Sequence, residues 1–369
     1  MAEPLKHHYG PDVPVRIGAM IVAVEPGFPV EAFLADALDG FEELELTHRA
    51  RHIARALARH LSDGFERSVD ILVRSLGPPI VADELTGIDS FLYLPHVFYV
   101  AEHGLEHWEA SMRAQYELTK RFSAEYSIRA FVDHEPERTL ARLREWTSDP
   151  SPHVRRLVSE GTRPRLPWAP RLQRFVVDPT PVLELLELLK DDPAPYVRRS
   201  VANNLNDIGK DHPDLLVATC RRWALGANDE RRWVIRHALR SAVKRGDAGA
   251  LAVLGFSDPE AAELGSFELA PSRARIGDTV RVTFELRNAS AESARFNADL
   301  RVHFVKANGR TSPKVFKVRE VELAPLGSVT LSKKISLQQR TTRTHYPGDH
   351  AVDVIVNGVT TSTGSFRIT

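Results

Sequence analysis

The sequence predicts a multidomain protein in which an all-α, HEAT-like helical-repeat solenoid is followed by an all-β, immunoglobulin-like sandwich. Three observations lead to this fold class. Apolar residues recur with a helical period over roughly the first two thirds of the chain, a segment of that region occurs twice, and the period then changes to two. At 369 residues the chain has room for about two domains, which we expect at 1–258 and 259–369.

The helical period extends from about residue 13 to about residue 255. In the segment HRARHIARALARHL, Ile53, Leu57 and Leu61 recur every four residues, which places them on one face of a helix. Paired Pro and Gly residues at Pro26 and Gly77 mark breaks between helices. Glycine-rich phosphate loops and the G-x-S-x-G nucleophile elbow do not occur in this stretch, so the enzyme classes that use them have no support.

An internal repeat indicates the kind of helical array. DPSPHVRRLVSEG begins at Asp149, DPAPYVRRSVANN begins at Asp192, about 40 residues later, and ERRWVIRHAL is a weaker third copy. This period, with two helices per unit, is typical of HEAT-like solenoids, in which neighbouring helix pairs bury one another's apolar faces. The second helices of the units line the inner surface. They are rich in Arg here, as expected for a cradle that follows a nucleic-acid backbone.

After SDPEAAELGS (257–266) the apolar pattern alternates. RIGDTVRVTFELRN places Val280, Val282, Phe284 and Leu286 on one face of a strand, and FNADLRVHFV repeats the pattern. Further strands are expected in VFKVREVEL, SVTLSKKISL, HAVDVIVN and SFRIT. About seven short strands in roughly 100 residues are typical of an immunoglobulin-like sandwich.

The composition is that of a folded globular protein, with 43% hydrophobic and 27% charged residues. Cys220 is the only cysteine, which excludes an intrachain disulfide and a multi-cysteine zinc site. No apolar run approaches the roughly 20 residues needed to cross a bilayer, and the N-terminus lacks the order of a signal peptide. We therefore expect a protein of the reducing cytoplasm.

The formal net charge is zero, from 49 Lys and Arg against 49 Asp and Glu, but the charges are unevenly spread. Acidic residues dominate the first part of the chain, and basic residues dominate the middle and the end. This asymmetry favours contact of the middle and the end with a polyanion. The alternative is that these charges are solvated helix faces.

Four segments of the helical region resemble the AlkC branch of the bacterial alkylpurine DNA glycosylases, which is related to AlkD. They occur in the family's order and are TKRFSAEYSIRAF (119–131), HVRRLVSEGTRPRLPWA (153–169), YVRRSVANNLNDIGKDHP (196–213) and RRWVIRHALRSAVKRGD (231–247). The resemblance extends over residues 5–256, and some members of the branch carry an immunoglobulin-like C-terminal domain. It implies a monofunctional glycosylase, without β-lyase activity, that removes cationic N3-methylated bases from bent duplex DNA without fully flipping them. The expected substrates are 3-methyladenine and 3-methylcytosine, and the sequence does not rank them.

The chemistry of such a reaction explains which residue types it needs. An N3-methylated purine is already cationic and leaves readily, so no strong general acid is required. Carboxylates stabilise the oxocarbenium-like sugar or orient water, and an aromatic face attracts the cation. The resemblance assigns the catalytic carboxylate first to Asp207, with Glu125 and Glu160 as further acids and Trp168 as the aromatic contact to the lesion.

Structural explanations exist for the same residues. Arg156–Glu160 and Glu125–Arg129 have the i,i+4 spacing of surface ion pairs, and Trp168 could be a packed loop aromatic.

For several other residues, the sequence favours a structural role over a functional one. Trp223 and Trp233 have the spacing of core residues, and Cys220 is expected to be buried. His103 and His107 could share a helix face but lack the H-E-x-x-H order, so we expect no metal and no cofactor.

The expected partner is double-stranded DNA that contains alkylated bases, with no membrane and no nucleotide cofactor. A monomer located at the bacterial nucleoid is expected. Two alternatives remain open, a non-catalytic scaffold that binds DNA or a protein and a DNA-bending protein without chemistry. The residues predicted to contact DNA are Arg155, Arg156, Arg163, Arg165, Arg198, Arg199, Arg232, Arg236, Arg240 and Lys244.

Overall fold

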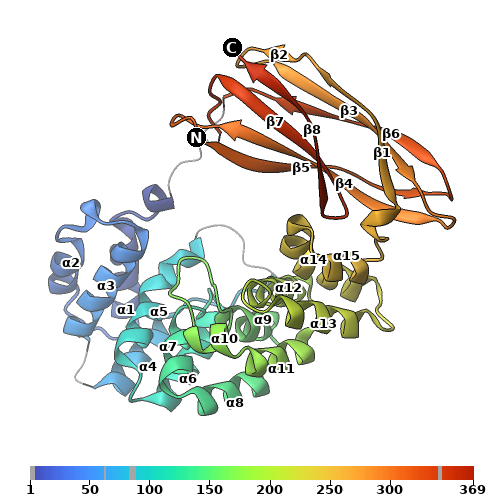
Figure 1. Cartoon of the computed structure of the whole chain (residues 1–369). Coiled ribbons are helices and arrows are strands. Elements are labelled where there is room, and N and C mark those ends of the chain that lie inside the picture. Colours follow the sequence, from blue (N-terminus) through green and yellow to red (C-terminus); the bar gives the residue numbers. More distant parts are fainter. Residues whose placement is uncertain (1–4, 62–63, 83–88, 340–342) are drawn as a thin grey trace. The chain divides into compact units, whose positions relative to one another are not determined.

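The computed structural model describes residues 5–61, 64–82, 89–339 and 343–369, and it forms two compact units. The first unit contains the helices up to α12 together with residues 227–238, and the second contains residues 217–226 and 239–369. Figure 1 shows the helical part in blue to yellow and the strands in orange to red. The predicted order, a helical array followed by a β-sandwich, is confirmed. The exact boundary at 258/259 stays a prediction.

The helical part is built from helices of one to five turns. In the described residues, no helix combines the length and the apolar character that a membrane crossing would need. The α-helices are α1 (Asp12–Val22), α2 (Val30–Leu38), α3 (Leu46–His60), α4 (Phe65–Ser75), α5 (Leu94–His103), α6 (Trp108–Thr119), α7 (Ser127–His134), α8 (Pro136–Trp146), α9 (Pro152–Gly161), α10 (Gln173–Val177), α11 (Thr180–Leu189), α12 (Pro195–Ile208), α13 (Pro213–Ala224), α14 (Asp229–Arg245) and α15 (Ala248–Val253).

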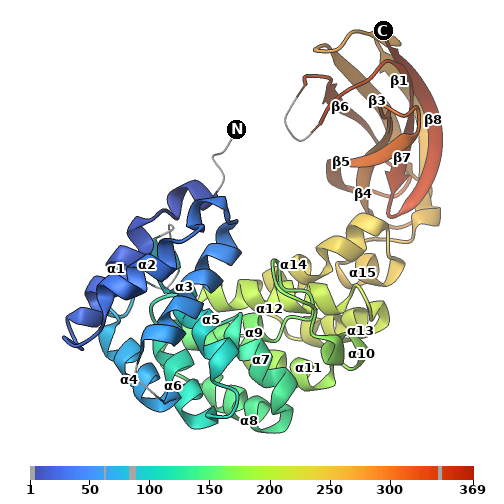
Figure 2. The ribbon, with the colours of Figure 1, turned by 90° about the vertical axis from the view of Figure 1, so that its left-hand side faces the viewer.

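The helices of the first unit stack in two rows. In Figures 1 and 2, α4, α6, α8 and α11 form one row, and α5, α9 and α12 form the other, on the inner side of the arc that the rows make in Figure 1. The apolar stripe of α3 is buried as its period predicted, with Ile53 and Leu57 fully enclosed. Each helix thus hides its apolar face against neighbouring helices, which is the packing expected of a solenoid.

The two clear copies of the repeat have the same local structure. Asp149 accepts a hydrogen bond from the backbone N–H of Ser151 at 2.8 Å, and Asp192 accepts one from that of Ala194 at 2.9 Å. A proline then opens each helix, where its missing N–H costs nothing. Val154 and Val197, at matching positions of α9 and α12, are fully buried. The repeated sequence therefore encodes one turn and one helix start, used twice.

Two antiparallel-rich sheets form the sandwich. One has the strand order β1-β3-β6 and the other the order β2-β8-β7-β4-β5, in which only β2 and β8 run parallel among the described pairs. The strands are β1 (Ala262–Ala270), β2 (Arg273–Ala274), β3 (Thr279–Asn288), β4 (Ala294–Val305), β5 (Thr311–Leu323), β6 (Ser328–Ser336), β7 (Gly348–Val356) and β8 (Val359–Ile368).

The core between the sheets follows from the alternating sequence pattern. Val280, Val282, Phe284 and Leu286 of β3 are all buried, and the intervening residues of β3 face outward or are half-buried. Side chains from both sheets complete one apolar core. This confirms the predicted immunoglobulin-like architecture.

The end of α14, from Leu239, and all of α15 belong to the same compact unit as the sandwich. Gly246, after α14, and Gly358, in the turn between β7 and β8, approach so closely that a Cβ on Gly246 would lie 2.5 Å from the Cα of Gly358. Both glycines have positive φ angles, of 80° and 85°. Any other residue at either position would be strained and would also collide with the backbone opposite.

Candidate active site

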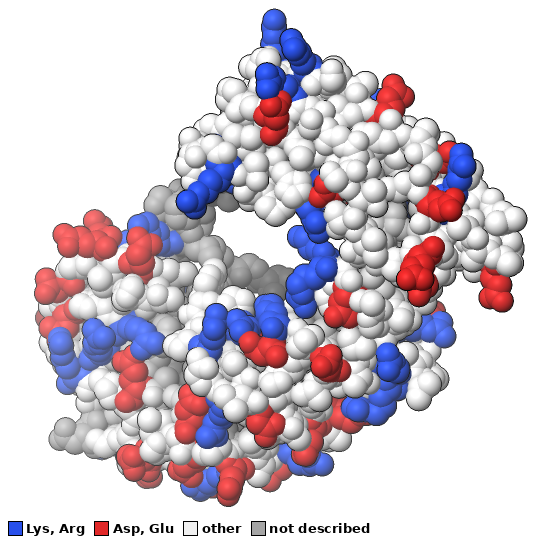
Figure 3. Space-filling model, in the orientation of Figure 1, with Lys and Arg blue, Asp and Glu red and all other residues white. Residues whose placement is uncertain are grey.

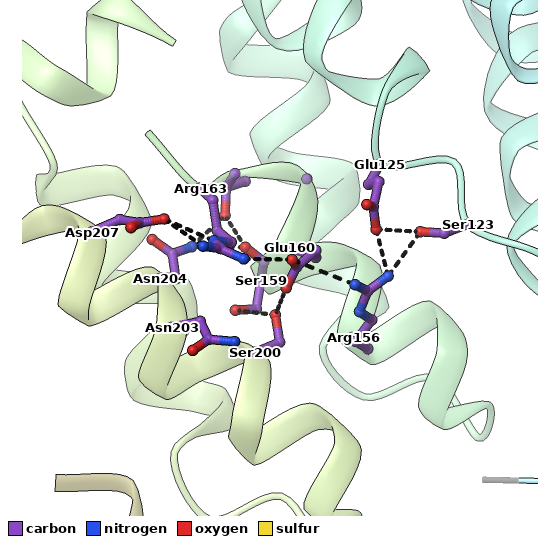
Figure 4. Close-up of polar contacts among 12 residues, drawn as sticks. Ser123, Glu125, Arg156, Ser159, Glu160, Arg163, Ser200, Asn203, Asn204 and Asp207 are labelled. Carbon is purple, nitrogen blue, oxygen red and sulfur yellow. Dashed lines mark hydrogen bonds and ion pairs between the residues drawn. The ribbon is translucent and has the colours of Figure 1, made fainter. Parts of the chain in front are cut away.

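The three acids predicted from the sequence lie together in one cluster, joined by two arginines (Figure 4). Arg156 donates from Nη1 to Oε2 of Glu125 at 2.5 Å, and its Nη2 lies 3.4 Å from Oε1 of Glu160. Arg163 donates from Nη1 to the same Oε1 of Glu160 at 2.7 Å and from Nε to Oδ2 of Asp207 at 2.8 Å. Acids and arginines therefore alternate along one continuous chain of contacts from Glu125 to Asp207.

The helical repeat explains why these residues meet. Glu160 and Asp207 lie near the C-terminal ends of α9 and α12, which are corresponding helices of two repeats and pack against each other. Arg156 precedes Glu160 by about one turn, so both lie on one face of α9. Glu125 comes from the segment between α6 and α7, and Arg163 comes from the loop after α9.

Glu160 is held as a fixed negative charge. Its Oε1 contacts both arginines, its Oε2 accepts a hydrogen bond from Ser200 at 2.6 Å, and the residue is only 6% exposed. Burial alone would raise the pKa of this carboxyl, but the charges of Arg156 and Arg163 and the Ser200 hydrogen bond outweigh burial and hold the pKa below its ordinary value. Glu160 is therefore ionised at neutral pH.

Asp207 is held on both oxygens. Arg163 donates to Oδ2 from Nε and Nη2, and the Nζ of Lys210 lies 2.7 Å from Oδ1. Asp207 itself is 1% exposed, so it does not face solvent on the outer side of the solenoid. Lys210 was not among the predicted residues, although its i,i+3 spacing from Asp207 in the sequence could have indicated the pair.

Glu125 is the acid with an available oxygen. Its Oε2 accepts from Arg156 and from the hydroxyl of Ser123 at 2.8 Å. Within the described parts of the chain, no donor contacts its Oε1. This oxygen can accept a hydrogen bond from water or from a ligand.

Arg129 holds the loop that carries Trp168 through hydrogen bonds to its backbone. The buried guanidinium of Arg129 donates to three backbone carbonyl groups of this loop, those of Gly161 at 3.2 Å, Arg163 at 2.6 Å and Pro170 at 2.6 Å. Trp168 is 65% exposed and has a φ of +63°, a left-handed conformation that is unfavourable for a bulky residue. Such strain in an exposed aromatic residue is a feature of functional loops.

These contacts decide between the explanations that the sequence left open. The predicted alternative of a Glu125–Arg129 surface pair is wrong, because Arg129 is buried and donates to carbonyl groups instead. The Arg156–Glu160 pair exists, but it is buried inside the cluster rather than on the surface. Trp168 is not a packed loop aromatic, since most of its surface is exposed.

The predicted DNA contacts fall into two groups. Arg155 is paired through two nitrogens with Asp192, and Arg165 is paired with Asp211. Arg198 donates to the carbonyl groups that precede α12, just as Arg155 does before α9. With Arg156 and Arg163 in the acid cluster, these side chains make internal contacts. The exposed members of the set are Arg199, Arg232, Arg236, Arg240 and Lys244.

Charges of both signs are interspersed over the visible face of the protein (Figure 3). One group of Lys and Arg side chains lies near α10, in the middle of the helical part.

Of the two tryptophans that were expected in the core, one is buried and the other is not. Trp223 is buried, as is Cys220, but Trp233 was wrongly expected in the core, since it is 44% exposed and stacks on His237 at 4.9 Å.

The predicted metal alternative gains no support from geometry. His107 stacks on Phe65, and the His103 ring packs against Tyr99. Within the residues that the structure describes, no three His, Cys, Asp or Glu side chains gather in a way that could hold a metal ion.

Several polar residues of the cluster were missed by the sequence reasoning. Ser123 and Ser200 hydrogen-bond the acids, and Asn204 donates to the carbonyl of Ser159 at 2.7 Å, which ties α12 to α9. Serine and asparagine occur at many positions without a functional role, so the residue type alone does not identify a member of the site. Only the spatial pairing of the two repeats identifies them.

Known proteins resemble this chain over its whole length. The family model described as "Uncharacterised protein YhaZ, C-terminal Ig-like domain" matches residues 263–369. The protein YhaZ of Bacillus subtilis (strain 168) is 33% identical over 365 residues, which cover 99% of this chain and 99% of YhaZ. The solved structure of the Pseudomonas fluorescens alkylpurine DNA glycosylase AlkC, bound to DNA containing an abasic site analog, is 33% identical and superposes with a TM-score of 0.88 over 100% of both chains. With this full-length likeness, and with the helical repeat and the Ig-like domain in the same order, the chain belongs to the AlkC family of alkylpurine DNA glycosylases.

Proposed function

We propose that this protein is a monofunctional DNA glycosylase that hydrolyses the N-glycosidic bond of cationic N3-methylated bases in duplex DNA, acting as a monomer without a cofactor. The proposed substrates are 3-methyladenine and 3-methylcytosine. The observation that carries the proposal is the buried acid cluster beside an exposed, strained tryptophan loop. The similarity to AlkC over the whole length supports it.

The proposed reaction begins with cleavage of the bond between C1′ of the sugar and the base. The bonding electron pair passes to the base, which loses its positive charge and leaves as neutral 3-methyladenine. The sugar becomes an oxocarbenium-like cation. Glu160, which Arg156 and Arg163 hold ionised, and Asp207, which Arg163 contacts at 2.8 Å, supply the negative potential that stabilises this cation.

Water completes the proposed reaction. Its oxygen adds to C1′, and it gives up one proton, so the product is an intact abasic sugar with a hydroxyl group at C1′. We assign the orientation of this water to Glu125, because its Oε1 has no donor in the described parts of the chain. A carboxylate in this position accepts the hydrogen bond of water and then its proton.

Recognition of the lesion is assigned to Trp168. An indole face attracts a cationic base by about 0.5–2 kcal/mol, with the larger value in a desolvated site. The hydrogen bonds from Arg129 to the carbonyl groups of Arg163 and Pro170 hold the backbone of the loop that presents Trp168. A neutral base gains less from the same contact, which gives the site a preference for methylated bases.

Contact with the DNA backbone is assigned to the exposed basic side chains. Arg236 of α14 and Arg199 of α12 are exposed, and α14 also carries Arg240 and Lys244. Phosphate contacts of this kind position the duplex without reading its sequence. For the internally paired Arg155 and Arg165 we propose a structural role instead, because their donors already serve Asp192 and Asp211.

We propose hydrolysis without β-elimination, because a lyase needs a neutral amine that can attack C1′. The amine that the structure describes at the acid cluster is that of Lys210, and its Nζ is engaged by Oδ1 of Asp207 at 2.7 Å.

The experiment that tests the proposal is chromatography of the bases released from methylated duplex DNA. We expect release of 3-methyladenine by the wild-type chain. Asp207→Asn should bind the same DNA but release the base at least about 100-fold more slowly, since it removes a charge that acts in the transition state. DNA binding without base release by the wild type would favour a DNA-bending protein. Absence of salt-sensitive DNA binding would favour a scaffold.

A further inference from the structure

The chain of acids and arginines ends in a lysine that reaches solvent. Lys210 lies in the turn after α12, and its Nζ is 2.7 Å from Oδ1 of Asp207. The other oxygen of this carboxylate accepts from Arg163. The side chain of Lys210 is 40% exposed, whereas that of Asp207 is 2% exposed. Lys210 is therefore the most exposed member of the cluster.

Lys210 also balances the charge of the cluster. The acids Glu125, Glu160 and Asp207 alternate with the cations Arg156, Arg163 and Lys210 along one series of ion pairs. With Lys210 in place the cluster is neutral. Without its ammonium group the cluster carries one negative charge, next to Oδ1 of Asp207.

The two cations of Asp207 differ in how firmly they are held. Arg163 is nearly buried and bridges two acids, so removing it from Asp207 would also break its contact with Glu160. Among the described residues Lys210 makes one ion pair, and its long, flexible side chain has access to water. Because the ammonium group of Lys210 is accessible to solvent and is not shared with a second acid of the cluster, a competing cation can replace it.

We propose that Lys210 is the resident counterion of Asp207, and that a cationic nucleotide replaces it at Oδ1 on binding. A neutral nucleotide cannot take this place, and Asp207 then stays paired with Lys210. Lys210 thereby sets how strongly the site distinguishes a charged nucleotide from a neutral one. This inference rests on the proposed glycosylase function, and it makes Lys210 a positioning residue that acts through Asp207.

The test compares two DNA duplexes that differ in one charge. One contains a neutral tetrahydrofuran abasic analogue, and the other contains a cationic pyrrolidine analogue of the same sugar. The dissociation constants of the full-length protein for both are measured by fluorescence anisotropy, and their ratio gives the preference for the cation. Lys210→Met should increase this preference about two- to fivefold, because the ligand no longer competes with an ammonium group.

A second variant separates replacement from a long-range charge effect. Lys210→Arg keeps the charge but can hold the carboxylate through two N–H groups, so the preference for the cation should fall below that of the wild type. Lys120→Met is the matched control. Lys120 forms an i,i+3 pair with Glu117 at 3.1 Å, and Glu117 is not one of the acids of the cluster, so the loss of Lys120 should leave the ratio unchanged.

The remaining outcomes overturn the inference. Equal weakening of both duplexes by Lys210→Met would make Lys210 a phosphate contact, and the glycosylase proposal would stand without it. A wild-type ratio in Lys210→Arg, with an increased ratio in Lys210→Met, would show that the charge acts from a distance without being replaced. If the wild-type protein bound neither duplex, the proposed function would fail together with the inference.

Discussion

Arg163 is the cation that Glu160 and Asp207 share. Its guanidinium contacts Glu160 through Nη1 and Asp207 through Nε and Nη2, in a site with little access to water. Removing one partner from a buried ion pair leaves an uncompensated charge, which costs far more than the pair itself contributes. The position of both carboxylates therefore depends on this one residue.

We expect Arg163→Met to lower the free energy of unfolding by about 3–5 kcal/mol, measured by urea denaturation. Arg163→Lys should cost less, because the charge is retained while the bridging geometry is lost. The control is Arg232→Met, since Arg232 pairs with Asp229 in an exposed position and its removal should change stability by no more than about 0.5 kcal/mol. A similar small change for Arg163→Met would mean that the cluster is not a structural unit.

Trp168 combines exposure with a left-handed backbone, and two substitutions separate these properties. Trp168→Ala and Trp168→Gly both remove the indole ring, so both should weaken binding of methylated DNA more than binding of unmodified DNA. Only glycine accepts the φ of +63° without strain, so Trp168→Gly should be about 1 kcal/mol more stable than Trp168→Ala. Thermal unfolding and paired binding curves measure the two effects. Equal loss of affinity for both DNAs would remove the lesion contact.

At the scale of elements, the repeat in the sequence made the fold predictable. The Asp-Pro-x-Pro start and the buried valines of α9 and α12 encode a turn and an apolar face, and both are local properties. The sandwich was predictable for the same reason, because its alternating pattern is read residue by residue.

The candidate site was predictable only in part, because its contacts join distant segments. The grouping of Glu125, Glu160 and Asp207 followed from a family resemblance, whereas the roles of Arg129 and Lys210 emerged only in three dimensions. Arg129 had the spacing of a helix-surface pair with Glu125, yet burial gave it backbone carbonyl groups as partners. Spacing along a helix identifies neighbours, but it does not reveal which of them face the interior.

The same distinction separates arginines that look equivalent in the repeat. Arg198 closes the start of α12 by donating to the carbonyl groups of Asp192 and Pro193, whereas Arg236 is exposed on α14. We expect Arg236→Gln to weaken DNA binding and to reduce the slope of log affinity against log salt by about 1. Arg198→Gln should leave the slope unchanged and lower stability. Anisotropy titrations at several salt concentrations measure the slopes, and equal slopes for Arg236→Gln and the wild type would remove Arg236 from the interface.

At the scale of the whole molecule, the free energy of unfolding at low pH depends on side chains whose pKa differs between the folded and the unfolded protein. Glu160 has a pKa below its ordinary value, so its contribution to stability is lost only as the pH falls below about 4.5. His96 affects the stability at a higher pH than Glu160 does. It lies on α5 against Val69, Leu72 and Leu118, and neither ring nitrogen has a hydrogen-bond partner in the described structure.

Burial lowers the pKa of His96 from 6.5 to about 4. Between these values the unfolded chain binds a proton that the folded chain does not, so stability must fall as the pH decreases from 6.5 to 4. A shift of this size corresponds to about 3 kcal/mol. We expect His96→Leu to remove most of this pH dependence, and to be more stable than the wild type at pH 5, because it also removes unpaired polar atoms from the core. Urea denaturation followed by circular dichroism at several pH values measures both effects. His48→Leu, at an exposed position of α3, is the control and should retain the wild-type slope. An unchanged slope in His96→Leu would mean that the His96 ring gains a proton or a polar partner in the folded protein.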